Sequence, residues 1–421
     1  MIIKKNLIIT SALIAINLIS VVSAGTWLKW ESKNKNIKGQ IFGRINIQSG
    51  VTDTDDSTNT ITTNSDYLYY RRIRIGASGQ IGPVSFKIEP DFASYMETVS
   101  DSNVDFKDVW VGYQFKMFDI KHKFILGNDQ KPCGLEIQNS SRFTNHIERH
   151  GTLSSWCQGE RSKGYRLHSS SKNWTTHLGY SVGEGKNSDT DLTHGTYGVR
   201  ATYSPLAFNK KDKQWLHTGF MWGYNKTDGS DNDWGSSRTD ASRFISSGPR
   251  LNILKTGEHK DATRYGIELA FGQGPLDVQY ERMWMSVDGC GGDSLTGGSC
   301  TSIGTEYDFS AWSHYVTASY FLPFGQGKIM RAYNPEKGSY ERIKVSNAAM
   351  VAYRYGYQDY ADAANNKTRG NIADHTFTLN YFFNPYHSVQ VEYYRATFDF
   401  SDATNTSDKA DVFQLNWRID F

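Results

Sequence analysis

The chain has 421 residues, of which 38% are hydrophobic and 14% aromatic, and its formal net charge is +2 at pH 7. A mean hydropathy of −0.57 excludes a protein built of membrane-spanning helices, because each such helix needs about 20 consecutive apolar residues. The near-zero charge gives no reason to expect a nucleic-acid partner. The 25 Tyr and 11 Trp fit the aromatic girdles of a membrane β-barrel, although secreted glycan-binding β proteins are rich in the same residues.

The first 24 residues have the pattern of a secretory signal peptide. Lys4 and Lys5 precede an apolar run from Leu7 to Val22, and small residues lead up to Ala24. This pattern predicts cleavage after Ala24, which would leave residues 25–421 as a single barrel domain. The alternative is an uncleaved anchor helix. Removing the two lysines leaves 46 − 2 = 44 basic residues against 44 acidic residues, so the exported chain is formally neutral.

The exported part is dominated by segments of about ten residues with apolar side chains at every second position. In the first segment, the isoleucines from Ile37 to Ile47 share one parity and Arg44 has the other. Similar segments begin near residues 67, 84, 108, 124, 165, 178, 197, 220, 265, 276, 309, 348, 374, 388 and 411. The pattern predicts an all-β, transmembrane antiparallel barrel of about 16 strands, an even number as bacterial barrels require.

The last segment favours a membrane barrel over a soluble β-sandwich or propeller. Its apolar residues are Phe413, Leu415, Trp417, Ile419 and Phe421. A soluble edge strand this apolar would invite aggregation. Pairing with the first strand would instead close a barrel and leave no backbone donor unpaired in lipid. A final aromatic residue also looks like the signal by which the insertion machinery recognises outer-membrane barrels.

Several short fragments, spread along the exported chain, carry a family pattern. They are 70–76 (YRRIRIG), 86–93 (FKIEPDFA), 109–113 (VWVGY), 127–136 (GNDQKPCGLE), 148–149 (ER), 200–205 (RATYSP), 265–268 (YGIE), 320–322 (YFL) and 411–421. In this order they resemble the phosphate-selective porin (O and P type) family of Gram-negative bacteria. The resemblance implies a trimeric barrel of about 16 strands whose third extracellular loop folds inward, here about residues 129–160. It also implies that Arg71 and Arg72 help to draw anions, although Arg71 has lipid-facing parity and would need a bulge or an interfacial position.

Function follows from barrel width, because a barrel of about 16 strands is too wide for its own side chains to fill. Parity and the resemblance together assign these residues to the pore wall or to the inward loop: Arg44, Arg72, Arg74, Lys87, Asp108, Lys131, Arg149, Arg166, Arg200 and Arg264. Charges of both signs create a field that selects among small solutes. For any single residue, the alternative is a solvated lumen side chain without a role in selection. We predict an outer-membrane porin with general or weakly anion-preferring passive diffusion.

Four cysteines remain in the exported chain, Cys133, Cys157, Cys290 and Cys300, in a compartment where disulfides persist. Three pairings are possible. Cys290 and Cys300 flank a glycine-rich stretch, so a bridge between them would close a small loop and leave Cys133 to pair with Cys157. A metal site is the alternative, but no CxxC pair or suitably spaced histidine accompanies these residues.

Catalytic motifs are weak. The segment 146–150 (HIERH) resembles a zincin box, but its glutamate is one place late, and neither a nucleophile elbow nor a phosphate-binding glycine loop is present. We therefore expect no enzymatic activity, cofactor or metal. A surface adhesin or antigen that uses a loop such as residues 226–261 is the alternative function, and a secreted soluble β protein is a second. The expected partners are outer-membrane lipid, the insertion machinery, further copies in a homotrimer, and small anions or polar solutes.

Overall fold

The computed structural model describes residues 28–33, 36–55, 66–93, 104–151, 157, 161–182, 195–206, 214–226, 237–238, 250–251, 258–290, 306–323, 331–362, 367–399 and 407–421. The predicted signal peptide at residues 1–24, Cys300 and most of the segment 226–261 lie outside these residues. The described residues contain no helix that is long and apolar enough to cross a membrane.

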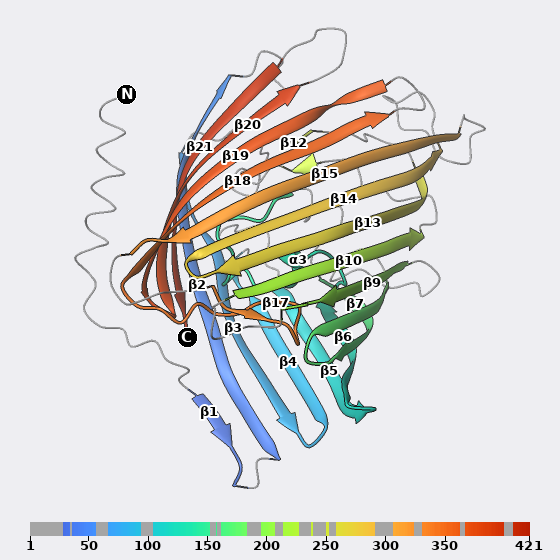
Figure 1. Cartoon of the computed structure of the whole chain (residues 1–421), viewed down its shortest axis with the longest axis vertical. Helices are drawn as coiled ribbons and strands as arrows, with labels where there is room; N and C mark the ends of the chain where they lie inside the picture. Colours follow the sequence, from blue (N-terminus) through green and yellow to red (C-terminus); the bar gives the residue numbers. More distant parts are fainter. Residues whose placement is uncertain are drawn as a thin grey trace.

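Sixteen strands of the described residues form a closed antiparallel barrel (Figure 1). Each strand pairs with the next along the chain, and the last one returns to the first, as the alternation predicted. In barrel order the strands are β2 (Ile37–Asp55), β3 (Asp66–Ile81), β4 (Val84–Asp91), β5 (Asp105–Met117), β6 (Ile120–Gln130), β7 (Arg161–Ser170), β8 (Trp174–Val182), β9 (Gly195–Tyr203), β10 (Gln214–Lys226), β13 (Glu258–Gln273), β14 (Leu276–Cys290), β15 (Glu306–Phe321), β18 (Ala348–Asp362), β19 (Lys367–Asn384), β20 (His387–Asp399) and β21 (Ser407–Asp420).

Closure takes place between β2 and β21, which pair from Arg44↔Asp420 to Asp55↔Lys409. At the end of the chain, Gly43 and Phe421 exchange two backbone hydrogen bonds, of 2.8 and 3.1 Å. Glycine is needed there, because a Cβ atom on residue 43 would lie 2.3 Å from the Phe421 ring. The predicted pairing of the first and last barrel strands is therefore confirmed.

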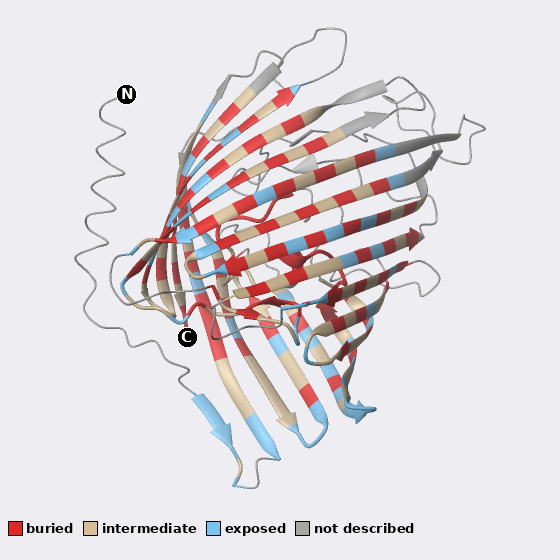
Figure 2. Ribbon diagram, in the orientation of Figure 1, coloured by how far each residue is buried: buried red, intermediate tan, exposed pale blue. Residues whose placement is uncertain are grey.

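The two faces of the barrel wall differ along every strand, and Figure 2 shows the resulting alternation of buried and exposed residues. On β2, the outward Ile45 is 38% exposed, whereas the inward Arg44 and Asn46 are 2% and 1% exposed. Large apolar side chains gather on the outer face because lipid replaces water there, and polar side chains gather inside. This reverses the arrangement of a soluble protein.

The two ends of the barrel have different connections. Two-residue turns join β3 to β4, β5 to β6, β13 to β14 and β19 to β20, all at the same end. Gly82 and Gly274 begin two of these turns with φ of 56° each, and Phe118 and Asp119 form another with φ of 50° and 62°, as tight hairpin turns require. We call this the turn end. In outer-membrane barrels it faces the periplasm and the longer loops face outward.

A few short elements accompany the barrel and were not predicted from the sequence. The strand β1 (Leu28–Glu31) pairs with β2 just beyond the end of β21, with Leu28 opposite Ile41. The pairs β11 (Ser237–Arg238) with β12 (Arg250–Leu251), and β16 (Tyr333–Asn334) with β17 (Ser339–Tyr340), are separate small sheets. A single helical turn, α3 (Leu135–Gln138), follows β6.

Candidate functional site

The predicted pore-wall residues lie at inward positions of the barrel. The arginines on β2, β3, β7, β9 and β13, together with Asp108 on β5, are all less than 9% exposed, and Lys87 on β4 is 26% exposed at its side chain. These inward, buried residues are Arg44, Arg72, Arg74, Asp108, Arg166, Arg200 and Arg264. Charged groups this deep in the molecule need partners, so the contacts of each group decide what it can do.

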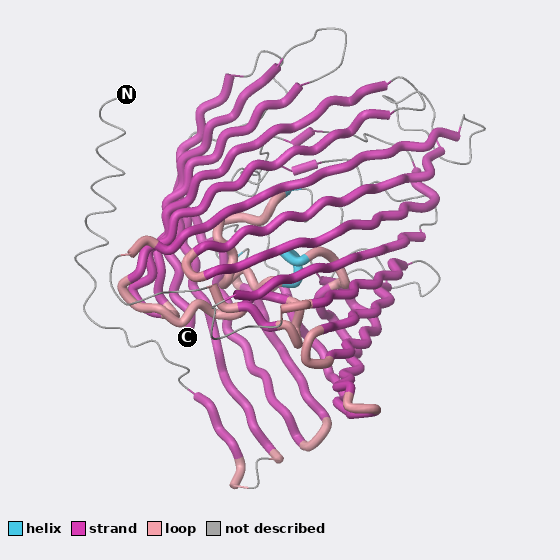
Figure 3. The backbone as a smooth tube through the Cα atoms, viewed as in Figure 1, coloured by secondary structure: helices cyan, strands magenta, loops and turns pink. Residues whose placement is uncertain are grey.

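Residues 131–151, which we call the inner loop, contact the inward side chains of many strands. The backbone N–H of Glu136 donates to Glu281 on β14 at 2.9 Å. His146 hydrogen-bonds with Thr317 on β15 at 2.8 Å and with Thr378 on β19 at 2.7 Å. Further hydrogen bonds reach Arg44 on β2, Arg354 on β18 and Glu392 on β20. In Figure 3 the helical turn of this loop is seen among the strands of the barrel. The contacts fix the loop to opposite parts of the wall.

The inner loop is also held covalently and by its own basic residues. Cys133 forms a disulfide with Cys157, which is the pairing that elimination favoured. Arg149 donates to the carbonyl oxygens of Glu136 at 2.8 Å and Asn139 at 2.6 Å, so it braces the loop from within. Lys131 is 2% exposed. Burial, with repulsion from Arg264 and Arg166, holds the pKa of Lys131 well below its usual value.

Arg71 turns inward through a β-bulge, one of the two alternatives that its parity had left open. The register of β2 and β3 shifts between Asn46↔Arg72 and Ile47↔Tyr70, and Arg71 is the extra residue. Its guanidinium group forms a two-bond ion pair with Glu148 of the inner loop, at 2.5 and 2.9 Å. Because this carboxylate neutralises it, Arg71 acts first as an anchor for the loop.

Four arginines surround the single carboxylate of Asp420 near the turn end of the pore. Arg44 and Arg142 each place Nε 3.2 Å from it, Arg342 places Nη1 at 3.1 Å, and Arg418 places Nε at 3.9 Å. They come from β2, the inner loop, the connection before β18, and β21. With four guanidinium groups and one side-chain carboxylate, positive charges exceed negative ones by 4 − 1 = 3 in this cluster. We call these four arginines and Asp420 the arginine cluster.

The remaining predicted residues are largely neutralised by neighbours. Lys87 lies 2.6 Å from Asp108 and 2.8 Å from Glu89, and Arg161 adds a third ion pair by approaching Asp108 at 3.0 Å. Arg74 pairs with Asp91 at 2.8 Å. These contacts connect neighbouring strands and leave little net charge at this part of the wall.

The arginines on β7, β9 and β13 differ in their partners. Arg200 forms a two-bond ion pair with Glu268, at 2.8 and 2.7 Å. Arg166 instead donates to the backbone carbonyl oxygens of Gln130, Tyr165 and Tyr180 at 2.6 to 3.2 Å, which stabilises the wall itself. Arg264 is 4% exposed, and its Nη1 has no hydrogen-bond partner among the described residues.

A second segment folds inward from the turn end, and sequence reasoning missed it. It comprises residues 331–345 of the connection between β15 and β18, and we call it the turn segment. The Tyr340 hydroxyl donates to Asp277 at 2.9 Å, and the indole of Trp215 donates to the Arg331 carbonyl at 3.2 Å. Burial and the nearby carboxylate of Asp277 raise the pKa of Tyr340 well above its usual value. The sequence of the turn segment has no alternating strand pattern, and no sequence signal indicates that this segment enters the barrel.

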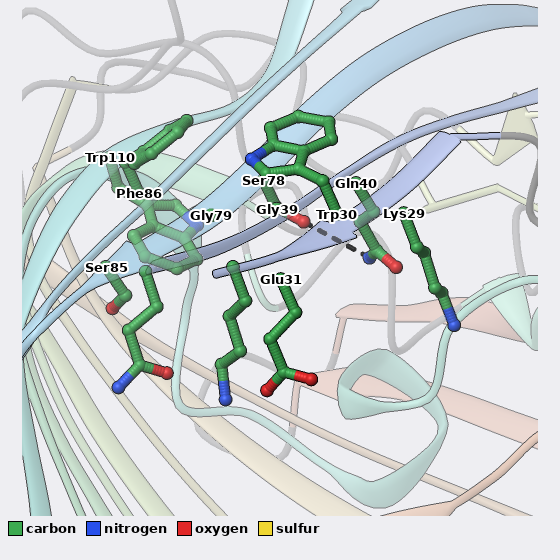
Figure 4. Close-up of a pocket in the computed structure, with 12 residues that line it drawn as sticks. Lys29, Trp30, Glu31, Gly39, Gln40, Ser78, Gly79, Ser85, Phe86 and Trp110 are labelled. Atoms are coloured by element: carbon green, nitrogen blue, oxygen red, sulfur yellow. Dashed lines mark hydrogen bonds between the residues drawn. The ribbon is translucent and has the colours of Figure 1, made fainter. Parts of the chain in front are cut away.

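A pocket of about 490 Å³ lies at the turn end, between β1 and the adjoining strands (Figure 4). Gln40 donates to Ser78 across it at 3.2 Å. It is lined by Lys29, Trp30, Glu31, Lys38, Gly39, Gln40, Ser78, Gly79, Gln80, Ser85, Phe86 and Trp110. No residue of the arginine cluster lines it, so the pocket is distinct from that cluster.

The sequence of the barrel matches a known protein family. The model of the family described as phosphate-selective porin O and P matches residues 43–421, nearly the whole barrel. The chain belongs to this family. Together with the closed barrel of polar interior and apolar exterior, membership makes the chain a porin channel of the Gram-negative outer membrane. No curated protein sequence matches this porin.

Solved structures support the same fold for this porin. The outer-membrane channel DcaP of Acinetobacter baumannii matches with a TM-score of 0.55 at 12% identity, covering 93% of this chain and 99% of that one. The trimer form of OmpT of Vibrio cholerae matches with a TM-score of 0.54 at 12% identity, covering 91% of this chain and 99% of that one. At this level of identity the likeness establishes architecture.

The zincin-like segment of this porin has other contacts. His146 hydrogen-bonds with two threonines, whereas His150 lies 3.3 Å from Asp374 on β19 and stacks on Tyr315. Within the described part of the chain, no group of three or more His, Cys, Asp or Glu side chains could hold a metal ion. Family and fold are those of a channel.

Proposed function

We propose that this porin conducts small hydrophilic solutes and ions passively and prefers small anions, with the inner loop at the narrowest part of the pore. The observation that carries the preference is the arginine cluster, in which four guanidinium groups share the side-chain carboxylate of Asp420. Lys87, Arg74, Arg161 and Arg200 are each paired with an acid, whereas in this cluster four arginines share one carboxylate side chain, which leaves an excess of positive charge.

The walls of the pore focus the electric field of the arginine cluster. Low-dielectric walls concentrate the field of uncompensated charge in the pore, so the local concentration of anions rises and that of cations falls. Arg142 and Arg342 are 16% and 21% exposed at their side chains, so a passing solute reaches them more readily than Arg44 or Arg418. Arginine also presents paired N–H donors that suit carboxylate, sulfate and phosphate groups.

The role of the inner loop as a constriction is supported by its attachments. The Cys133–Cys157 disulfide limits its span, and hydrogen bonds fasten it to side chains on several strands. A fixed loop in this position would narrow the channel by a constant amount. The part of the predicted loop at residues 152–156 and 158–160 lies outside the described residues.

Planar-bilayer recording tests the preference. Purified protein is inserted into a bilayer that separates two KCl solutions of different concentration, and the reversal potential is measured. We expect its sign to show that chloride permeates more readily than potassium. Addition of phosphate should reduce the chloride current if the arginine cluster holds oxyanions. A reversal potential of the opposite sign would show a cation-preferring pore and contradict the proposal.

We also propose that this porin forms a homotrimer and that its last strand is read by the insertion machinery. The first proposal is supported by the similar OmpT structure, which is described as a trimer form. The second is supported by the outward, alternating residues Phe413, Leu415, Trp417 and Ile419 of β21 and by Phe421, which directly follows the strand and pairs with Gly43. Light scattering of the purified protein, corrected for bound detergent, tests the trimer, and a monomeric mass would exclude it.

A further inference from the structure

The outward residues of β14 and β15 change from apolar to polar in an ordered way. From the turn end upward, the facing pairs are Leu276–Tyr320, Val278–Ala318, Tyr280–Val316, Arg282–His314, Trp284–Trp312 and Ser286–Ser310. Tyr320, Leu276 and Val316 are 43%, 39% and 37% exposed, as residues that face acyl chains are. The Trp pair has the place of the interfacial girdle, because the outward residues beyond it are serines. Arg282 and His314 therefore lie at the upper edge of the apolar band.

Aromatic rings surround these two basic residues. The guanidinium carbon of Arg282 lies 4.8 Å from the Trp284 ring centre and 4.5 Å from that of Trp312. His314 stacks on Trp312 at 5.5 Å, and further rings lie near it at Tyr280, Tyr355 and Tyr357, at 6.0 to 6.2 Å. Such rings hold a cation in place while they exclude water from it. The rings carry no negative charge, so the counter-ion of Arg282 has to come from outside the chain.

Within the described part of the chain, Arg282 has no ion pair with a carboxylate. Its Nε atom and the Nδ1 atom of His314 are buried and have no hydrogen-bond partner there. Arg395 on β20 differs, because it also points outward but lies 3.8 Å from Asp411. An outward, uncompensated arginine at the edge of the hydrocarbon band is unfavourable in lipid, so an anion is expected beside it.

We propose that Arg282 and His314 bind the phosphate of a lipid in the outer leaflet, while the acyl chains of that lipid lie along the apolar pairs below. The order of residues on β14 and β15 supports a lipid over a second copy of the chain. Directly beneath Arg282 and His314, three successive outward pairs are apolar or aromatic. This matches a molecule with a charged head above and hydrocarbon below. The loops at this end face outward, which assigns the site to the outer leaflet.

Lipid titration tests the proposal on the purified, detergent-solubilised porin. Mixed micelles receive increasing dioleoyl phosphatidic acid, and the unfolding midpoint is recorded at each step to obtain an apparent affinity. Dioleoylglycerol has the same chains without phosphate, and inorganic phosphate has the anion without chains. We expect the unfolding midpoint to rise with phosphatidic acid and to stay unchanged with either of the other two probes.

Variants locate the site. Arg282→Gln should weaken phosphatidic acid binding about tenfold, which is the usual effect of losing one charge-assisted hydrogen bond. Arg282→Lys keeps the positive charge and should retain most of the affinity. This result would show that the weaker binding of Arg282→Gln does not come from a general folding defect. Arg395→Gln is the matched control, since it removes an outward arginine that already has a carboxylate partner, and it should bind phosphatidic acid as the wild type does.

Four results would overturn the proposal. Equal stabilisation by dioleoylglycerol would show that only the chains are recognised, and equal stabilisation by inorganic phosphate would show a free-anion site. Wild-type affinity in Arg282→Gln would remove the assigned residue. Val316→Cys, which places a thiol in the acyl-chain path, would yield disulfide-linked dimers in membranes if a second copy covered this face.

Discussion

Arg331 and Asn145 join two segments that enter the barrel from opposite ends. The guanidinium group of Arg331, at the start of the turn segment, donates to the Asn145 side chain and to the backbone carbonyl of Phe143, both in the inner loop. It also lies 3.3 Å from Asp277 on β14 and 3.8 Å from the Tyr340 ring centre. One buried cation thus fixes the inner loop, the turn segment and the wall to one another.

Removing this junction should widen the channel. Arg331→Ala alone would strand the Asp277 carboxylate, at a cost of about 3 to 5 kcal/mol, so the informative variant is Arg331→Ala with Asp277→Asn. Each lost charge-assisted hydrogen bond is worth about 1.5 to 3 kcal/mol, enough to release the turn segment from the inner loop. We expect a higher single-channel conductance. Lys337→Gln serves as control because Lys337 lies in the same segment but is 63% exposed; a double variant with unchanged conductance would show that the junction does not limit flow.

Loss of the disulfide should make the inner loop less ordered without destabilising the barrel. Cys133 and Cys157 are 24 residues apart, and a bridge across such a loop stabilises it by about 3 to 4 kcal/mol. The Cys133→Ser, Cys157→Ser variant should keep heat-resistant migration of the folded barrel while its conductance becomes noisier and its loop more sensitive to protease. Cys290→Ser with Cys300→Ser is the control. Quiet wild-type traces from the first variant would contradict this role.

Much of the barrel could be predicted because lipid imposes a simple rule on each strand. Outward residues must be apolar, whereas inward ones need not be. A two-residue period of apolar side chains in the sequence therefore predicts both the strand and which of its residues face the lipid. Arg44, Arg166 and Arg200 were placed on the inner face by parity alone, and all three lie there with 1% to 2% exposure. Closure between Ile45 and Ile419 followed from the same rule.

The contacts inside the pore could not be predicted because they depend on loops without periodicity. Arg71 shows the limit, since a bulge of one residue moves it from the predicted outer face to an ion pair with Glu148. The turn segment shows it again, because Tyr333 and Tyr340 pack on Trp215 through burial that no local pattern encodes. Parity therefore predicts which residues face inward, whereas their partners come from tertiary packing.

Charge removal in the arginine cluster should reduce the anion preference in steps. A unit charge about 6 Å from the ion path contributes about 0.7 kcal/mol in water, which is about threefold in local anion concentration. Because the local potassium concentration changes in the opposite direction by the same factor, Arg142→Gln and Arg342→Gln should each lower the chloride-to-potassium permeability ratio by up to about tenfold. Lys116→Gln removes an exposed charge near the end of β5 and should leave the ratio unchanged. If all three variants keep the wild-type ratio, selection arises elsewhere.

Acidification should weaken the attachment of the inner loop through His146. Burial, and then repulsion from Arg354, lower the pKa of His146, while Glu392 at 3.6 Å opposes the shift. The folded protein therefore binds this proton less readily than the unfolded chain. The contribution of neutral His146 to stability is complete at high pH and declines as pH falls below the unfolded value of about 6.5.

The measurement is protease sensitivity of the inner loop between pH 7.5 and 5. Wild-type protein should become more sensitive as the pH falls, because a protonated ring is buried and is repelled by Arg354. His146→Gln keeps a donor and an acceptor and should flatten the dependence. His122→Gln, remote from the loop, should behave as wild type. An equal pH response in His146→Gln would assign the effect to another group.

The final residue should matter more for assembly in cells than for the stability of the finished barrel. The ring of Phe421 lies over Gly43, and its backbone pairs with the same residue. Phe421→Ala keeps the backbone pairing, so we expect it to refold from denaturant into detergent micelles with nearly wild-type yield. If the insertion machinery reads the aromatic end, the same variant should reach the outer membrane several-fold less efficiently, and Phe421→Tyr should restore insertion. Gly43→Val would instead overpack the site at about 1 to 3 kcal/mol and lower both yields. Heat-modifiable migration of the outer-membrane fraction, compared with the micelle yield for each variant, separates recognition from packing, and full insertion of Phe421→Ala would show that the terminal ring is not read.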